Sequence, residues 1–407
     1  MTAAAKSTPK PLAGVKVLEF GTLIAGPFCT RILAEFGAEV IKIEAPGEGD
    51  PLRVWRKLHE GTSLWWYVQS RNKKSVTLNL KHPDAIAVAR KLAAEADIVV
   101  ENFRPGVMER LGLGWDVLAA DNPGLVMVRL SGFGQSGPMR EQAGFGAIGE
   151  SMGGLRYVTG YPDRPPVKTG VSIGDSIAAL WAAVGALMAL RHRDVTGGKV
   201  AGQGQVVDVA LYEAVFAMME SLVPEFGTAG FMRERTGNVM PGITPSNTHT
   251  TRDGQHLIVG ANGDAIFKRL MRVLDRADLA DDPQLANNAG RDARDAEVYA
   301  AIDEWVGRHD ADMVLETLAA AQVPASKIFS VEDMFRDAQY LARGMIETWQ
   351  LPDGTALKLP GIVPKLSATP GGTDWIGPRL GEHTEEILGS AGYSAEEIAA
   401  LRRQGAI

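Results

Sequence analysis

Short apolar runs alternate with stretches of helical spacing through the first half of the chain. Residues 15–20 have the pattern of a strand, 27–36 that of a helix and 39–43 that of a second strand. This order predicts a βαβ unit, because a strand that follows a crossover helix returns as a parallel neighbour. The alternation continues with strands at 76–80, 98–100, 125–130 and 204–210, and with helices at 83–96, from Ser176 and through Leu222. We therefore expect an α/β fold with a doubly wound, mostly parallel sheet.

The composition changes after residue 225. Residues 226–251 are rich in Gly, Thr, Asn and Pro, which is typical of a crossing segment, and the stretch up to residue 330 fits a smaller α+β unit. Short strands, Pro/Gly turns and terminal helices follow. We expect a large domain of residues 1–225, completed by the C-terminal segment 331–407, and a small domain of residues 226–330.

The chain is acidic as a whole, with 42 Lys and Arg against 49 Asp and Glu. That balance makes nucleic acid and anionic membranes unfavourable partners. Cys29 is the only cysteine, which excludes an internal disulfide and fits a reducing compartment, so we expect a cytoplasmic protein. The longest apolar run, 177–190, falls short of the ~20 residues that span a bilayer, and we expect a buried helix there.

Two kinds of bound group have little support in the sequence. The seven histidines are dispersed without a His-Glu-x-x-His pattern, so no metal site is expected. Gly132, Gly134 and Gly137 form a Gly-x-Gly-x-x-Gly pattern after a strand, but Pro138 and Gly144 interrupt the helix that dinucleotide binding needs. We expect a loop at this position and no permanently bound cofactor.

Positive charge concentrates near the N-terminus. Residues 1–110 hold 16 Lys and Arg and 12 Asp and Glu, a net charge of +4 in an acidic protein. A phosphate-bearing ligand would collect such side chains, and an ordinary solvated face would carry them equally well. Charge alone leaves both interpretations open.

Asp175 follows Gly174 at the start of a long apolar helix. As an N-cap, Asp175 or Ser176 would stabilise that helix by ~1 kcal/mol. In the alternative interpretation, a carboxylate at a helix N-terminus stays ionised, close to backbone N–H groups that can stabilise a developing oxyanion. The two interpretations are compatible.

Several segments in order resemble the class III coenzyme A transferases, the family of formyl-CoA transferase and carnitine-type CoA-transferases that also contains α-methylacyl-CoA racemase. The landmarks are LAGVKVLEF, AGPFCTRILAEFGAEVIKIEAPGEGDPLR, NKKSVTLNLK, VENFRPGVMERLGLG, GDSIAALWAAVGALMAL, GQVVDVALYEA and LGEHTEEIL. The resemblance covers nearly the whole chain. It implies an interlocked, ring-shaped homodimer and a catalytic aspartate at Asp175, which attacks an acyl-CoA and passes through an anhydride and an aspartyl-CoA thioester.

The resemblance also implies where coenzyme A binds. Ile24 and Ala25 correspond to residues near the thioester, and Phe145 stands where formyl-CoA transferase has a tyrosine. The adenine edge and the pantetheine and phosphate contacts correspond to Leu78, Asn79, Lys81, Asn102, Phe103, Arg104 and Arg110. Gly260 and Gly263 fall on the family's mobile glycine-rich loop, where a plain strand-to-helix turn is an equal alternative.

The expected activity is CoA transfer from a donor such as succinyl-CoA to a small mono- or dicarboxylate acceptor. The alternative is an acyl-CoA racemase or isomerase, for which the family uses a histidine thirty residues before the aspartate; that position is Phe145. A third class is a non-catalytic CoA-binding subunit. Arg164 and Lys168 are predicted to pair with a distal acceptor carboxylate.

Overall fold

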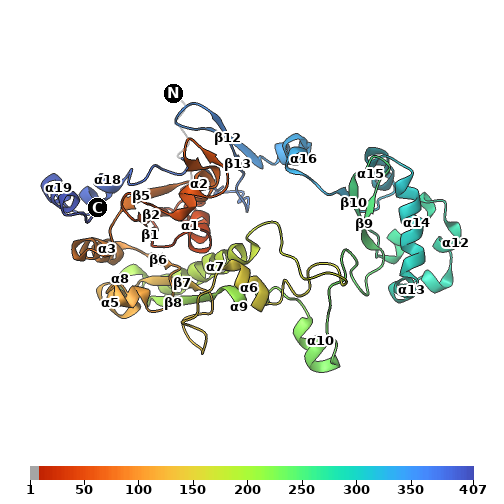
Figure 1. Ribbon diagram of the computed structural model, residues 1–407, viewed down its shortest axis with the longest axis horizontal. Helices are drawn as coiled ribbons and strands as arrows, with labels where there is room; N and C mark the ends of the chain where they lie inside the picture. The colour runs from red at the N-terminus through yellow and green to blue at the C-terminus, as the bar shows by residue number, and fades with distance from the viewer. Residues whose placement is uncertain (1–8) are drawn as a thin grey trace. The chain divides into compact units, whose positions relative to one another are not determined.

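The computed structural model describes residues 9–407, which divide into two compact units (Figure 1). The first, called the sheet unit, runs to Arg156 and includes Lys168–Met232 and Met345–Ile407. The second, called the small unit, comprises Tyr157–Val167 and Arg233–Gly344. From the sequence, residues 157–167 are expected in the large domain. They belong to the small unit because their backbone and side chains hydrogen-bond to residues 234–237.

A six-stranded parallel sheet forms the centre of the sheet unit, in the order β5-β2-β1-β6-β7-β8. Its strands are β1 (Lys16–Glu19), β2 (Glu39–Glu44), β5 (Lys73–Thr77), β6 (Ile98–Glu101), β7 (Val126–Ser131) and β8 (Gln205–Ala210). The chain winds outward from β1 through β2 to β5, then returns to β6 and winds the other way. The order therefore reverses between β1 and β6, and ligands of such sheets bind at the carboxyl ends of the strands at that switch point.

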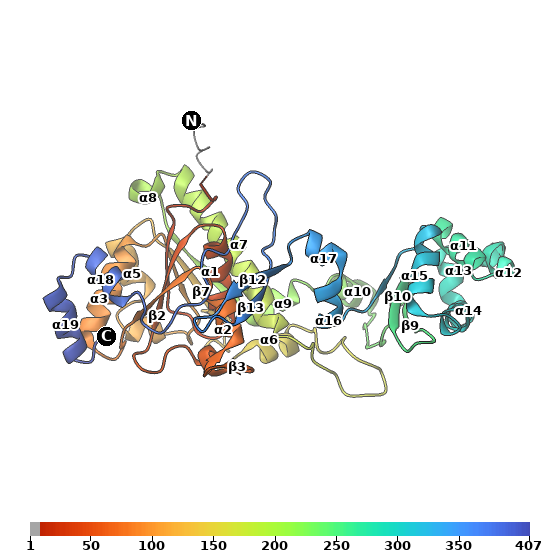
Figure 2. The same ribbon diagram turned by 90° about the horizontal axis from the view of Figure 1, so that it is seen from above.

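Helices cover both faces of this sheet, as both views show (Figures 1 and 2). Neighbouring residues of β1 face opposite layers, with Leu18 packed in one apolar cluster and Val17 in the other. The Leu18 layer contains α3 (Pro83–Glu95), α5 (Trp115–Asp121), α18 (Thr384–Ser390) and α19 (Ala395–Arg403). The Val17 layer contains α1 (Ala25–Glu35), α7 (Ile173–Val195) and α9 (Leu211–Phe216). The expected doubly wound, mostly parallel α/β sheet is confirmed.

Helix α7 packs against α1, α9, β7 and β8. Ala178, Ala182 and Ala186 recur at helical spacing on its buried side, and their small side chains let the helix lie close to the sheet. By length and composition α7 could also cross a membrane, and 44% of its most apolar window is buried in the protein. Core helices of soluble proteins pass the same test, so this is weak evidence for a span.

Shorter elements complete the sheet unit. They are a 3₁₀ turn at Pro51–Val54, β3 (Leu58–His59), β4 (Thr62–Ser63), α2 (Leu64–Gln69), α4 (Val107–Arg110), α6 (Gly146–Met152), α8 (Gly198–Ala201), α10 (Leu222–Ala229), β12 (Ile346–Gln350) and β13 (Ala356–Pro360). The hairpin β12–β13 is antiparallel and packs its leucines with Trp66 of α2. The C-terminal segment therefore returns to the sheet unit, but from Met345 and not from residue 331. Residues 226–232, expected in the small domain, also belong to the sheet unit.

The small unit is built on an antiparallel sheet in the order β11-β10-β9. Leu257 and Val259 of β10 are buried while Ile258 between them is exposed, so one face of the sheet carries the core. Its elements are β9 (Ser246–Thr250), β10 (His256–Gly260), α11 (Asp264–Val273), α12 (Ala277–Ala280), a 3₁₀ turn at Pro283–Leu285, α13 (Asn288–Ala293), α14 (Asp295–Gly307), α15 (Ala311–Ala320), β11 (Ala325–Lys327), α16 (Val331–Arg336) and α17 (Ala338–Ala342).

Strand β5 and the helix after β8 differ from the sequence expectation, and α7 begins at Ile173 and not at Ser176. Strand β5 begins at Lys73, three residues earlier than expected, because the buried Lys73 side chain has an ion-pair partner that apolar patterning does not reveal. The helix expected through Leu222 ends at Phe216, and Glu220, with a positive φ of 48°, lies in the turn before α10.

Candidate active site

A cavity of about 390 Å³ lies at the carboxyl ends of the strands, at the switch point of the sheet. The turn after β1, residues 22–25, and the loop after β6, residues 102–105, form two of its walls. Residues 130–132 of β7 and its loop contribute a third wall, and the N-terminal turns of α6 and α7 a fourth. The fold thus brings together segments that are far apart in the sequence.

The turn after β1 is held in an unusual conformation. Leu23 has a φ of 64°, which non-glycine residues rarely adopt and which costs about 1–3 kcal/mol. Asn102 accepts a hydrogen bond from the Thr22 backbone N–H at 2.8 Å and donates to the Thr22 carbonyl at 2.9 Å. The Asp50 carboxylate accepts from the Leu23 N–H at 3.0 Å, and Gln69 donates to the Ile24 carbonyl at 2.9 Å. These contacts fix the backbone that lines the cavity.

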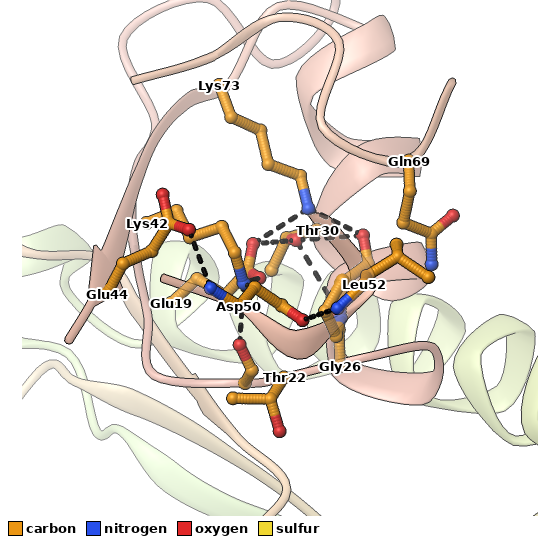
Figure 3. A network of polar contacts seen from close by, with 12 residues as sticks. Glu19, Thr22, Gly26, Thr30, Lys42, Glu44, Asp50, Leu52, Gln69 and Lys73 are labelled. Atoms are coloured by element: carbon orange, nitrogen blue, oxygen red, sulfur yellow. Dashed lines mark hydrogen bonds and ion pairs between the residues drawn. The ribbon is translucent and has the colours of Figure 1, made fainter. Parts of the chain in front are cut away.

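A buried network of charged side chains lies beside that turn (Figure 3). The Lys42 ammonium contacts Glu19 at 2.7 Å, Asp50 at 2.8 Å and the Gly21 carbonyl at 2.7 Å, and Lys73 contacts the other Glu19 oxygen at 2.8 Å. Burial alone would raise the pKa of Glu19, but the two lysines hold it at about 2. All four charged side chains are almost fully buried. Removal of any one of these side chains would therefore leave an uncompensated charge in the core.

Asp175 is the third residue of α7, whose N-cap is Ser172, so the expectation that Asp175 or Ser176 caps the helix is wrong. The Asp175 carboxylate lines the cavity and is half-buried. Burial raises its pKa to about 6, the negative charge of Glu150 adds to the rise, and a hydrogen bond from its own backbone N–H opposes it. A side chain at Gly146 would place Cβ against the Asp175 carboxylate, so any larger residue there would displace that carboxylate.

Glu150 and Arg156 stand beside Asp175 and were not found from the sequence. Glu150, on α6, is 3% exposed and accepts hydrogen bonds from Arg156 Nε at 3.1 Å and Nη2 at 3.0 Å. Its second oxygen accepts from the Gly174 N–H at 3.2 Å. No local pattern places this pair beside Asp175, because that position depends on the packing of α6 against α7. The one sign in the sequence is that Glu150 shares a helix face with the small residues Gly146 and Gly149, where a buried carboxylate needs a partner.

A second cavity of about 590 Å³ adjoins the first, and Arg104 and Pro105 line both. Its other cationic side chains are Arg110, Arg129 and Arg140. Arg129 is held by Glu101 at 2.8 Å and by Glu109 at 2.7 Å, whereas no acidic partner of Arg104 or Arg110 is found within residues 9–407. The clustered guanidinium groups can bind phosphate oxygens.

The segments that line these cavities lie within a match to one protein family. The family model described as CoA-transferase family III matches residues 12–384. The chain belongs to CoA-transferase family III. Among the relatives of this CoA-transferase is the succinyl-CoA–D-citramalate CoA-transferase of Chloroflexus aurantiacus, 48% identical over 98% of each chain. The succinate–glutarate CoA-transferase of Agrobacterium fabrum is 33% identical over 93% of this chain and 95% of its own.

A solved structure resembles this CoA-transferase as well. The crystal structure of a CAIB/BAIF family protein from Brucella suis superposes with a TM-score of 0.83 at 33% sequence identity, covering 94% of this chain and all of its own. The family predicted from the sequence landmarks is confirmed, and so is the assignment as a CoA-transferase.

The first cavity gathers most of the residues that the family resemblance implied: Ile24, Ala25, Asn102, Phe103, Arg104, Phe145 and Asp175. Arg110 lines the adjoining basic cavity. Leu78, Asn79 and Lys81 line neither cavity. Leu78 is buried in the core. The backbone and side-chain N–H groups of Asn79 donate to the Ala406 and Gly405 carbonyls, so they already have partners in the C-terminal segment.

The remaining predicted residues fall in different units. Lys168 lines the first cavity. Arg164 belongs to the small unit, where its side chain is 72% exposed beside Asp163. Gly260 ends β10 and Gly263 precedes α11, also in the small unit. A role for these two glycines as an active-site lid stays a prediction.

Proposed function

We propose that this CoA-transferase moves coenzyme A from succinyl-CoA to a small dicarboxylate, with Asp175 as the nucleophile. The observation that carries the proposal is the Asp175 carboxylate in a cavity at the switch point of a family III fold. The names of the relatives support the substrates, since they pair succinyl-CoA with D-citramalate and succinate with glutarate. At 48% identity over nearly the full chain, the citramalate enzyme gives the strongest support.

The proposed reaction moves acyl groups and coenzyme A without a net proton transfer. The Asp175 carboxylate attacks the thioester carbonyl of the donor, the C–S bond breaks, and coenzyme A leaves as a thiolate. The thiolate attacks the aspartyl carbonyl of the resulting anhydride, which releases succinate and leaves an aspartyl-CoA thioester. The acceptor carboxylate then repeats both steps in reverse order. Partial burial supports this role, because exclusion of water protects the anhydride from hydrolysis.

The coenzyme A contacts follow from the two adjoining cavities. Ile24 and Ala25 are proposed to lie beside the thioester, and Asn102 and Phe103 along the pantetheine arm. Arg104 and Arg110 would bind the phosphates in the basic cavity. The adenine edge assigned to Leu78, Asn79 and Lys81 stays a prediction. No resident cofactor or metal takes part in this scheme, and the cytoplasmic location also stays a prediction.

We also propose a homodimer, interlocked as the family resemblance implies. Helix α7 presents an exposed apolar stripe at helical spacing, consisting of Leu180, Trp181, Val184, Leu187 and Met188. Apolar surface of this kind usually marks a protein–protein contact, which supports a second copy over this helix. Light scattering after gel filtration should give twice the 43.5 kDa chain mass, and a monomer at micromolar concentration would contradict the proposal.

The racemase alternative gains no support from the site. It needs a second proton carrier opposite Asp175, and the linings of both cavities, within residues 9–407, contain no histidine. Deuterium uptake at Cα of a branched acyl-CoA, without a free acceptor acid, would revive that alternative.

The test of the proposed function is a direct assay of thioester exchange. The enzyme is incubated with succinyl-CoA and either D-citramalate or glutarate, and the new acyl-CoA is measured by chromatography. We expect product with the native enzyme and a loss of at least about 1,000-fold in kcat for Asp175→Asn, since the covalent steps need the carboxylate. Unchanged exchange in that variant would refute the mechanism, and no exchange with any acid would refute the activity.

A further inference from the structure

Arg156 is oriented by Glu150 at three points. Its Nε and Nη2 groups donate to Glu150 Oε2 at 3.1 and 3.0 Å, and its backbone N–H donates to the Glu150 carbonyl at 3.3 Å. Glu150 itself is buried and attached to the Gly174 N–H. Because Gly174 immediately precedes Asp175, the guanidinium and the Asp175 carboxylate are fixed relative to each other through one glutamate.

The guanidinium of Arg156 keeps donors that its contacts with Glu150 do not use. Arginine has five N–H donors, of which the Glu150 contacts use two. No other acceptor of the Arg156 side chain occurs in the part of the chain that the structure describes. The side chain is 27% exposed and lines the first cavity together with Asp175. Its free edge, which includes Nη1, can therefore bind a carboxylate through two parallel hydrogen bonds.

The other cations of this cavity are less suited to that role. Arg56 is exposed and stacks on Trp65 at 5.0 Å, and Lys168 is exposed with no contact that fixes its ammonium group among residues 9–407. Arg104 is shared with the basic cavity. The cavity is nevertheless lined by four cationic and two anionic side chains, so its charge favours a substrate with two carboxylates.

We propose that Arg156, held by Glu150, binds the distal carboxylate of the acids that exchange coenzyme A at Asp175, and so selects dicarboxylates over monocarboxylates. The inference rests on the proposed function. In that mechanism the leaving acid and the entering acid occupy the same position next to Asp175. One guanidinium therefore recognises the succinyl group of the donor and the second carboxylate of the acceptor.

The experiment compares glutarate with valerate, five-carbon acids that differ by one carboxylate, at saturating succinyl-CoA. The ratio of their kcat/KM values is measured for the native enzyme and for Arg156→Gln, Arg156→Lys, Lys168→Gln and the control Arg191→Gln, an exposed position on α7. We expect Arg156→Gln to lower the ratio about 10- to 100-fold through loss of glutarate turnover, because a charged bidentate contact is removed. The kcat/KM for valerate should stay within about threefold, because this quantity reports only the reaction of the acceptor with the aspartyl-CoA intermediate and not the reaction with the donor.

Arg156→Lys keeps the positive charge and can still pair with Glu150, so this variant should fold. Its glutarate-to-valerate ratio of kcat/KM should fall about 3- to 10-fold, because lysine cannot form the two parallel hydrogen bonds. It remains decisive if Arg156→Gln does not fold. An unchanged ratio in both Arg156 variants, an equal loss for both acids, or a loss confined to Lys168→Gln overturns the inference while CoA transfer itself continues. Absence of transfer to either acid by the native enzyme instead refutes the proposed function, and this inference with it.

Discussion

The pH dependence of the first half-reaction gives a sharp test of the Asp175 environment. Burial, with the Glu150 charge beside it, raises the pKa of Asp175 to about 6. Only the ionised carboxylate attacks a thioester, and a pKa of about 6 leaves about nine-tenths of it ionised at pH 7 and about one-tenth at pH 5. The rate of acylation should therefore fall about tenfold between these two pH values. An aspartate with its ordinary pKa would give an almost flat profile over this range.

Replacement of Glu150 by glutamine isolates the electrostatic contribution. It removes the negative charge beside Asp175 and leaves the Arg156 charge uncompensated, and both changes favour the ionised Asp175. The inflection should move below pH 6 but stay above the ordinary pKa of 3.8, because burial is the larger cause of the shift. The control is Glu48→Gln, an exposed glutamate outside both cavity linings, whose profile should match the native enzyme.

The assay should use butyryl-CoA, because its acyl group has no second carboxylate that would titrate. Enzyme and substrate are mixed for a single turnover between pH 5 and pH 8, quenched, and analysed by intact-protein mass spectrometry for attached coenzyme A. Circular dichroism at each pH confirms that the fold persists. A flat profile would show that burial does not perturb Asp175, and an inflection unmoved by Glu150→Gln would show that the two carboxylates do not interact.

Three further outcomes follow from the same contacts. Gly146→Ala places Cβ against the Asp175 carboxylate and should lower kcat at least about 100-fold, whereas Gly170→Ala, with open space around it, should retain activity; native kcat in the Gly146 variant would contradict the geometry. Lys42→Met leaves the buried Glu19 charge with one cation fewer, so the free energy of unfolding, measured with denaturant, should fall by about 3–5 kcal/mol. A fall of less than about 1 kcal/mol would show that the buried Glu19 charge does not depend on Lys42. Asp175 has a folded pKa above its unfolded value, so its ionisation costs stability as the pH rises from about 4 to 6. Asp175→Asn should therefore raise the unfolding free energy by about 1–3 kcal/mol at pH 7.5, and this gain should vanish below about pH 3, where the carboxyl group is protonated in both states.

The parallel sheet was predictable because its strands and helices differ in apolar period. Strands β1 and β2 and helices α1 and α3 lie within two residues of their expected bounds. Strand β5 was misplaced because it begins with a charged residue, Lys73, and the sequence gives no sign that Glu19, 54 positions earlier, neutralises it in the core. A local pattern reveals which apolar residues are buried. Burial of a charged residue instead depends on an ion-pair partner that only the tertiary structure brings close.

The candidate site divides in the same way. Asp175, Asn102 and Arg104 could be named from family landmarks, and the cavity brings them together. Glu150 and Arg156 could not, since their roles depend on how α6 and α7 pack. The sequence also gave no sign that residues 157–167, which carry Arg164, belong to the small unit, because the hydrogen bonds that hold them there involve residues more than seventy positions away.

The central claim is that coenzyme A becomes bonded to the Asp175 carboxyl group during turnover. The most direct measurement incubates the enzyme with succinyl-CoA, treats it with hydroxylamine or borohydride, and maps the peptides by mass spectrometry. Conversion of the Asp175 side chain to its hydroxamate or its alcohol, dependent on succinyl-CoA, is the result that the account predicts. An unmodified Asp175 peptide from a sample that is demonstrably exchanging thioesters would contradict it.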